Sequence, residues 1–226
     1  LLTVFYSERL IGGKVNGRPG WLDFSLEYKA KKGENRYLNT FRRIAGRYLF
    51  IECPKGLNIR YAGVCPTDYP LVETHRKFAD PLVQKIYDTS VYTLRCCLHE
   101  HYEDCPGREQ ALYAMDSRNQ MLCGYFAFRG SAYQRSNLVL ISKGLRPDGL
   151  LSICFPAGMD YPIPFFSLVY VMQVYEYLSY TKDQSLLPIV RGTLDTIMKT
   201  FRSRIEENGL IASFEYPFWN FYECTD

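Results

Sequence analysis

The period of the apolar residues changes once along this chain, near residue 78, and that change limits the folds the chain can form. Before it, four short β-prone runs alternate with turn segments such as "GGKVNGRPG" and "KKGEN", as antiparallel strands do. The four runs are "LTVFYS" (2–7), "WLDFSLEY" (21–28), "RYLFIEC" (47–53) and "LNIRYAGVC" (57–65). After it, the apolar residues follow the 3.6-residue period of helices. We therefore predict a β domain and linker over residues 1–78 and a helical domain over residues 79–226.

The helical domain opens with a clear start signal. Asp80 can cap a helix whose first position is Pro81, a residue that fits there because its missing N–H needs no partner. Leu82, Val83 and Ile86 begin a broad apolar face that continues to residue 98. Five helices are predicted, over residues 80–99, 108–126, 131–143, 165–180 and 186–207. Gly144 is a candidate C-cap for the third, and Asn208-Gly209 ends the fifth.

An internal repeat appears in the helical part. The stretches "DGLLSICFP" from Asp148 and "NGLIASFEYP" from Asn208 match in form, 60 residues apart, and each follows a predicted helix. This spacing indicates a repeated helical hairpin. A closed ring of six such hairpins would need about 350 residues on that spacing, whereas residues 79–226 number 148. We therefore expect only part of such a ring.

Composition excludes several classes of function. The net charge of +3 comes from 27 basic and 24 acidic residues interspersed along the chain, without the basic stripe of a nucleic-acid binder. No apolar run reaches the roughly 18–20 residues that cross a bilayer, so we expect no nucleic-acid partner and no membrane span. The chain begins Leu-Leu, which suggests part of a longer protein, and nothing indicates its oligomeric state.

The eight cysteines lack the short regular spacing of a disulfide scaffold. We expect most of them to be buried thiols that act as small apolar residues. This usage fits a bacterial cytoplasm or periplasm better than disulfide-rich secretion, although the compartment itself is not indicated.

Acidic residues concentrate in "LHEHYEDCPGREQALYAMDSRNQ", residues 98–120. On a helix over 108–126, Glu109, Tyr113 and Asp116 would share one face, because residues four and seven apart lie close in azimuth. Asp104 would precede that helix as its N-cap, and Arg108 would open its first turn. Such a set suits sugar chemistry, since carboxylates accept hydroxyl hydrogen bonds, a ring stacks on a sugar, and an acid can protonate a glycosidic oxygen.

Two other interpretations of this segment stay open. An amphipathic helix whose acids face water would have much the same sequence. A zinc site made of His99, His101 and Cys105 uses suitable ligand types, but the spacing matches no established zinc pattern. We predict no metal and no cofactor, and we expect the two histidines to be structural.

The motif Asp-Cys-Pro-x-Arg-Glu, residues 104–109, with a second Asp seven positions after the Glu, resembles the signature of bacterial α-L-rhamnosidases. These are inverting glycoside hydrolases that remove terminal α-L-rhamnose. The flanking stretches "YAGVCPTDYPLVE" and "DPLVQKIYDTSVYTLR" are also similar to that family. The resemblance implies a partial antiparallel β-sandwich over residues 1–78, followed by the first part of an (α/α)6 barrel over residues 79–226.

The resemblance also implies roles for individual residues. Glu109 matches the general acid of the family. Asp104, Arg108 and Asp116 match residues that bind the rhamnose hydroxyls, and Tyr113 falls where an aromatic side chain lies against the sugar. The partner that this implies is a carbohydrate substrate, a terminal α-L-rhamnoside.

The closing stretch "FWNFYECTD", residues 218–226, resembles a family loop in which a Trp follows an acid beside the sugar. Here the acid is Glu223 and the next residue is Cys224, so Trp219 is the candidate for the stacking ring. An inverting mechanism also needs a general base, and in the family this Glu lies late in the barrel. We therefore expect the base beyond residue 226.

Two further function classes remain open at the level of sequence. A non-catalytic carbohydrate-binding or structural helical protein could use the same scaffold. Another (α/α)-toroid glycosidase or lyase could act on a different deoxysugar or uronic acid. Sequence beyond residue 226 would distinguish the first class from an enzyme. Rhamnose soaking or a panel of aryl glycosides would distinguish the second from a rhamnosidase.

Overall fold

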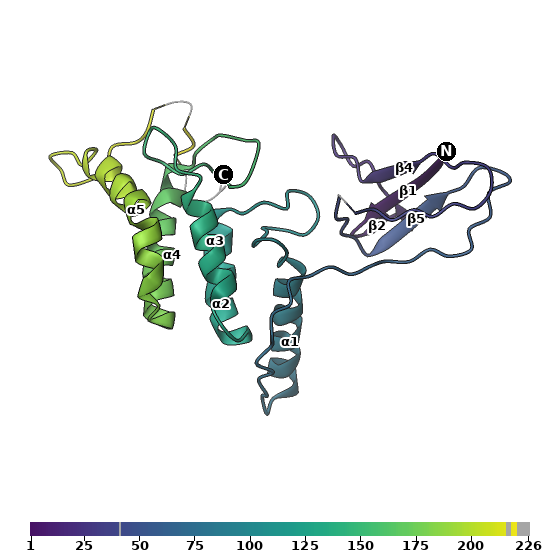
Figure 1. Cartoon of the computed structure of the whole chain (residues 1–226), viewed down its shortest axis with the longest axis horizontal. Helices are drawn as coiled ribbons and strands as arrows, with labels where there is room; N and C mark the ends of the chain where they lie inside the picture. The colour runs from purple at the N-terminus through teal and green to yellow at the C-terminus, as the bar shows by residue number, and fades with distance from the viewer. Residues whose placement is uncertain (41, 216–217, 221–226) are drawn as a thin grey trace. The chain divides into compact units, whose positions relative to one another are not determined.

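The structure is a computed structural model that describes residues 1–40, 42–215 and 218–220 (Figure 1). The chain forms two compact units. The first contains Leu1–Pro66 together with Pro106–Arg108, and the second contains Thr67–Cys105 and the chain from Glu109 onward. Within the described ranges, none of the helices is both long and apolar enough to cross a membrane.

The first unit is built on a small antiparallel sheet with β1 at its centre. Its strands are β1 (Leu2–Ser7), β4 (Ser25–Tyr28) and β5 (Tyr48–Glu52), in the order β4-β1-β5, and a separate hairpin pairs β2 (Leu10–Ile11) with β3 (Lys14–Val15). Phe5 of β1 pairs directly with Phe50 of β5, and their ring centroids lie 6.4 Å apart. Such cross-strand aromatic pairs stabilise a sheet.

Three of the four predicted strands are confirmed, and "LTVFYS" is matched residue for residue by β1. The fourth prediction, over residues 57–65, is wrong, because these residues form no strand. A strand needs a partner for its backbone N–H and C=O groups. In the described part of the chain, residues 57–65 pair with neither β4 nor β5, the two outer strands of the sheet.

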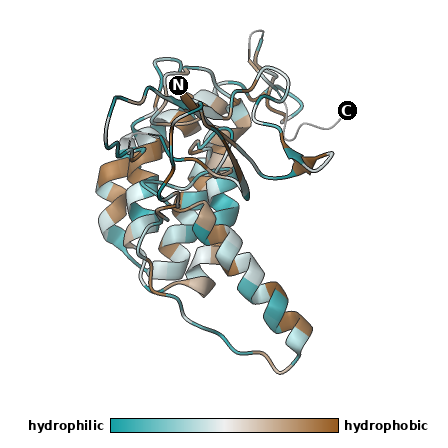
Figure 2. Ribbon diagram, turned by 90° about the vertical axis from the view of Figure 1, so that its right-hand side faces the viewer, coloured by the Kyte–Doolittle hydropathy of each residue, from teal (hydrophilic) through white to brown (hydrophobic). Residues whose placement is uncertain are grey.

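The second unit is helical, as predicted. Its helices are α1 (Pro81–Cys96), α2 (Ala114–Ala127), α3 (Ala132–Ser142), α4 (Pro164–Thr181) and α5 (Leu187–Arg202), with a 3₁₀ turn at Gln184–Leu186. Helix α2 packs against α1 and α4, and α3 packs against α4 and α5 (Figure 1). Brown apolar and teal polar residues are interleaved on these helices (Figure 2).

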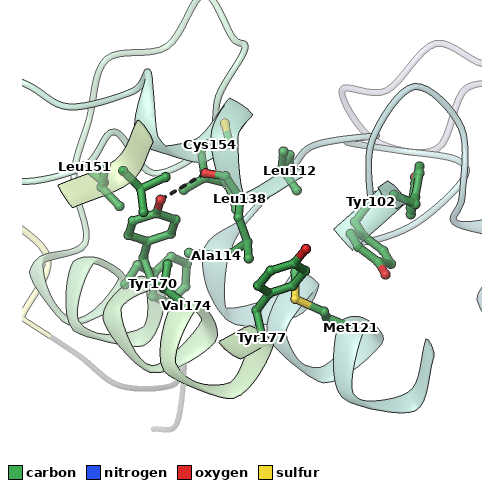
Figure 3. Close-up of a cluster of buried hydrophobic side chains, with 14 of the residues drawn as sticks. Tyr102, Leu112, Ala114, Met121, Leu138, Leu151, Cys154, Tyr170, Val174 and Tyr177 are labelled. Atoms are coloured by element: carbon green, nitrogen blue, oxygen red, sulfur yellow. Dashed lines mark hydrogen bonds between the residues drawn. The ribbon is translucent and has the colours of Figure 1, made fainter. Parts of the chain in front are cut away.

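The core of this unit lies between α2, α3 and α4 (Figure 3). Tyr170 of α4 is fully buried, and its hydroxyl donates a hydrogen bond of 3.0 Å to the carbonyl of Leu138 in α3. Met121 and Tyr177 fill the neighbouring volume. A buried tyrosine needs a partner for its hydroxyl, so this bond both satisfies Tyr170 and joins two helices.

Helix α1 begins as predicted but buries less of its apolar face than expected. Asp80 accepts hydrogen bonds from the backbone amides of Leu82 and Val83, at 2.7 and 3.3 Å. However, Leu82 is 65% exposed and Ile86 is 58% exposed. Only the second half of the helix reaches the core, where Val91 and Leu94 are buried and Tyr87 packs against the cluster.

Two predicted helix ends are wrong. Helix α5 ends at Arg202 and not at 207, because the following residues fold into a turn in which the Glu206 amide donates to the Leu210 carbonyl. At the end of α3 the capping residue is Lys143 and not Gly144. Glycine is needed at 144 for space, since an added Cβ would lie 2.9 Å from the Cβ of Phe155.

The predicted repeat is confirmed in two turns 60 residues apart, the first turn (residues 144–152) and the second turn (residues 204–212). Leu145 bridges Leu151, and Ile205 bridges Ile211 in the same way. Three backbone hydrogen bonds also correspond. In the first turn the amides of residues 146, 149 and 152 donate to the carbonyls of residues 150, 146 and 144. In the second turn the amides of residues 206, 209 and 212 donate to the carbonyls of residues 210, 206 and 204. The two segments thus form one turn structure twice.

The expectation of mostly buried cysteines is wrong. Among the described cysteines, Cys97 and Cys154 are buried, whereas Cys53, Cys65 and Cys123 are exposed. Cys123 belongs to α2, and the other two lie in the first unit. All the described cysteines are free thiols.

Candidate functional site

The acidic segment is a closed loop that leads into a helix. The expected helix from residue 108 is wrong, because α2 begins at Ala114 and residues 106–109 form a turn. Gln110 has a φ of 54°, which no residue inside a right-handed helix adopts. Tyr113 is extended and forms a bridge with Cys154. Glu109 and Asp116 therefore do not share a helical face.

Asp104 closes the loop. Its backbone amide donates to the carbonyl of Ala111 at 3.1 Å, and its carboxylate accepts from the amide of Ala111 at 2.9 Å. The predicted role as an N-cap of α2 is thus wrong, since the capping position belongs to Tyr113. The two bonds fix a half-buried carboxylate at the base of the loop.

Glu109 lies at the end of the turn and is exposed. The hydroxyl of Tyr113 donates a hydrogen bond of 2.8 Å to its Oε2. The expected closeness of Glu109 and Tyr113 is therefore confirmed, although the loop and not a helical face brings them together. This bond orients a carboxyl group that is accessible to a ligand.

Asp116 occupies the first turn of α2 and is half-buried. Burial raises the pKa of its carboxyl, a hydrogen bond from its own backbone amide opposes this shift, and the negative charge of Asp104 raises the pKa further. The two carboxyl groups are therefore electrostatic neighbours. Like charges held together in a partly buried place favour the neutral form of one of them.

Two buried thiols, those of Cys154 and Cys97, lie near Asp104. Burial raises the pKa of the Cys154 thiol, and the charge of Asp104 adds to that effect. Burial raises the pKa of Cys97 to about 11, with contributions from Cys96, Cys105 and Asp104. These thiols are protonated at neutral pH and act as apolar surroundings, not as nucleophiles.

The remaining predicted residues are Arg108, Trp219 and Glu223. Arg108 is exposed and belongs to the first unit. Trp219 is 50% exposed, and its ring meets that of Tyr161 edge-on, with centroids 4.9 Å apart. Glu223 and Cys224 lie outside the described residues.

Both histidines of the segment have protein partners. His99 places Nδ1 2.9 Å from Oε2 of Glu103 and Nε2 3.0 Å from the carbonyl of Thr67. His101 places Nδ1 2.7 Å from the carbonyl of Tyr102. Within the described ranges, no three His, Cys, Asp or Glu residues are grouped so that they could hold a metal ion.

Sequence reasoning missed Glu103, whose side chain is fully buried directly beside Asp104. Acidic residues are almost never fully buried unless they are paired. Its position within an acidic run suggests a solvent-facing residue, and the four-residue spacing from His99 is the one signal that could have revealed the pair. The carbonyl of Glu103 also accepts a hydrogen bond from the Gln120 side chain at 2.6 Å.

Chemically, the segment combines two unlike parts. Asp104 and Asp116 form a half-buried acidic pair that can accept hydrogen bonds from the hydroxyls of a ligand. Glu109 and Tyr113 form an exposed acid and an aromatic ring joined by a hydrogen bond. Such an arrangement can bind a polyol and transfer a proton to it.

Residues 76–221 match the family model of the bacterial alpha-L-rhamnosidase 6 hairpin glycosidase domain. The matched range contains the whole acidic segment. No curated protein matches the chain.

Solved structures of similar fold cover nearly all of this chain. The GH78 family rhamnosidase of Bacillus sp. GL1 superposes with a TM-score of 0.81 at 21% identity, over 97% of this chain and 23% of that one. A rhamnosidase from Klebsiella oxytoca with rhamnose bound gives 0.68 at 22% identity, over 96% of this chain and 46% of that one. An α-L-rhamnosidase from Dictyoglumus thermophilum gives 0.63 at 18% identity, over 90% and 24%. The chain thus spans less than half the length of each.

Proposed function

The chain belongs to the bacterial α-L-rhamnosidase family with a six-hairpin glycosidase domain, and from this premise we propose that it forms one wall of a site that removes terminal α-L-rhamnose. The observation that carries the proposal is the hydrogen bond from Tyr113 to Glu109 in the loop that Asp104 and Ala111 close, inside the range that matches the family. In the same proposal, the strands are part of a β-sandwich, and the helices are the first part of an (α/α)6 barrel.

Glu109 is the proposed general acid. Its exposure allows a glycosidic oxygen to approach, and the bond from Tyr113 holds the carboxyl group in one orientation. Protonation of the leaving oxygen lowers the barrier to bond cleavage, because a neutral alcohol leaves more readily than an alkoxide. Positioned acids of this kind contribute about 10²–10⁴-fold to rates.

Asp104 and Asp116 are the proposed ligands for the sugar hydroxyls. The two amide contacts with Ala111 immobilise Asp104, so little conformational entropy is lost when it binds a hydroxyl. The closeness of Asp116 to Asp104 supports a joint role, since two neighbouring acceptors match two neighbouring hydroxyls. We assign Arg108 and Tyr113 to the same sugar, one as a hydrogen-bond donor and the other as the ring beside its apolar face.

The reaction is proposed to invert the anomeric configuration. A water molecule then attacks the face opposite the leaving group, and it needs a carboxylate base about 6.5–9.5 Å from the acid. We place this base in the family's later helices, beyond residue 226. Trp219 and Glu223 are proposed to add a stacking ring and an acid near the sugar, and the edge-on contact of Trp219 with Tyr161 supports an aromatic surface there.

The test uses the full-length protein, which includes the proposed base, and compares two aryl α-L-rhamnosides. One has an acidic phenol as leaving group and the other a weakly acidic phenol. Glu109→Gln removes the acid with little change in shape. Hydrolysis of the poor leaving group is expected to fall by about 10²–10⁴-fold. The good leaving group is expected to lose far less, because it departs without protonation.

Asp104→Asn is the matched variant for this test. It weakens sugar binding, so both substrates are expected to lose kcat/KM by a similar factor. An equal loss on both substrates for Glu109→Gln would contradict its assignment as the acid. Hydrolysis of aryl glycosides of another sugar, but not of rhamnose, would contradict the substrate.

A further inference from the structure

His99 and Glu103 form a buried pair next to the proposed sugar site. The side chain of Glu103 is 0% exposed and that of His99 is 10% exposed. The pair lies where the chain turns from the end of α1 into the acidic loop, and the ring nitrogens of His99 face two different acceptors. Oε2 of Glu103 lies 2.9 Å from Nδ1, and the carbonyl of Thr67 lies 3.0 Å from Nε2.

These two contacts determine how many protons the His99 ring and the Glu103 carboxyl group carry together. A backbone carbonyl only accepts, so Nε2 carries the proton in its bond to Thr67. Nδ1 of a neutral ring would then turn its lone pair toward the carboxylate, and two acceptors 2.9 Å apart repel each other. A second proton must therefore lie between Nδ1 and Oε2. The pair is either imidazolium with carboxylate or neutral imidazole with carboxylic acid, and both forms have no net charge.

The backbone of Glu103 is also fixed. Its amide donates to the carbonyl of Cys97 at 2.9 Å, and its carbonyl accepts from the Gln120 side chain of α2 at 2.6 Å. One residue earlier, the amide of Tyr102 donates to the side chain of Asn137 in α3 at 2.9 Å. The residues before Asp104 are thus anchored to α2, to α3 and, through His99, to the extended segment at Thr67.

We propose that His99 and Glu103 are positioning residues that hold Asp104 in place for the sugar through one shared proton. The inference rests on the proposed function, because the role of Asp104 is assigned there. The new element of this inference is the contact of the His99 side chain with the carbonyl of Thr67, which ties the loop to the extended segment. Loss of this link frees the loop backbone directly before Asp104, and that movement breaks the contacts between Asp104 and Ala111.

The first test observes the shared proton in the unmodified protein. In a nuclear magnetic resonance spectrum at neutral pH, His99 is expected to give two slowly exchanging downfield protons, one at Nε2 and one between Nδ1 and Oε2. Glu103→Gln is expected to remove the second, because an amide donates its own proton to Nδ1. A single downfield proton in the unmodified protein would overturn the proposal without any variant.

The second test measures positioning and binding together. Glu103→Met removes the carboxyl group that faces Nδ1, and the amide proton of Ala111, which contacts Asp104, is expected to exchange on the order of tenfold faster. Rhamnose affinity measured by calorimetry is expected to fall by about tenfold, the size typical of losing a hydrogen bond to a charged group. Glu103→Gln is expected to restore both, since its amide can donate to Nδ1.

The control is Asp195→Asn, which breaks an ion pair with Arg191 of the same four-residue spacing but with side chains 69% and 76% exposed. It is expected to change neither measurement. Asp104→Asn separates the two proposals. If it binds rhamnose as the unmodified protein does, the proposed sugar site fails and the inference fails with it. If it weakens binding while Glu103→Met does not, the sugar site stands and only the positioning pair is wrong.

Discussion

The first turn (144–152) and the second turn (204–212) have the same backbone hydrogen bonds in opposite surroundings. Leu150 and Leu151 of the first are 0% and 1% exposed, whereas Leu210 and Ile211 of the second are 67% and 45% exposed. Because the geometry is the same in both, burial does not determine it. The comparison shows that a turn can form without burial, whereas its contribution to stability depends on how deeply its side chains are buried.

The geometry comes from the local sequence. The side chain of Asp148 accepts from the amide of Leu150 at 3.1 Å, and the side chain of Asn208 accepts from the amide of Leu210 at 2.8 Å. Each is followed by a glycine with positive φ, 82° and 80°. Asp and Asn favour such turns because their side chains bond to the backbone two residues later, and the following glycine adopts positive φ without strain. The local bonds are thus sufficient to form the turn twice.

Leu150 and Leu210, at the same position of the two turns, give the largest expected difference in the free energy of unfolding. Leu150→Ala removes a fully buried side chain from the core and is expected to lower the free energy of unfolding by about 2–5 kcal/mol. Leu210→Ala is expected to change it by no more than about 0.5 kcal/mol. Urea unfolding followed by far-UV circular dichroism measures both, and similar losses at the two positions would break the comparison.

The two glycines give the next difference. An added Cβ at Gly149 would lie 2.0 Å from Oγ1 of Thr200, whereas nothing lies within 4 Å of one at Gly209. Gly209→Ala pays only for positive φ, about 1 kcal/mol. Gly149→Ala adds a steric clash and is expected to cost about 2–3 kcal/mol. Thermal unfolding of the two variants provides the measurement; equal midpoints would show that the contact with Thr200 relaxes without cost.

The capping side chains give the smallest difference. Asp148 also bonds to Arg146 at 2.9 Å, and Arg146 contacts Asp160 as well. Asp148→Ala is therefore expected to cost about 1–2 kcal/mol, and Asn208→Ala about 0.5–1 kcal/mol. Hydrogen exchange at the amides of Leu150 and Leu210 reports each loss locally. Faster exchange at Leu210 than at Leu150 in the respective variants would reverse the predicted order.

Local signals were the part of the fold that could be predicted from sequence. The Asp80 cap, the strand at residues 2–7 and the repeated turn each depend on neighbours along the chain. Exposure was not predictable in the same way. The apolar face of α1 looks suited to burial, but Leu82 and Ile86 are exposed because the partner of a helix is set by distant segments.

In the candidate site, too, the sequence pattern did not reveal contacts that depend on the surrounding fold. Helical periodicity continued α2 back to residue 108, yet the two bonds between Asp104 and Ala111 close a loop that excludes a helix there. The contact of Tyr113 with Glu109 was predicted correctly for a reason that proved wrong. The burial of Glu103 depends on His99 and on the fold around both, and composition gives no sign of it.

The central claim is that the loop at residues 104–116 binds rhamnose beside an acid. A crystal structure of the protein with rhamnose tests it most directly. We expect sugar hydroxyls within hydrogen-bond distance of Asp104 and Asp116, with the anomeric oxygen facing Glu109 and the ring beside Tyr113. Rhamnose bound at another surface, with this loop unoccupied, would contradict it.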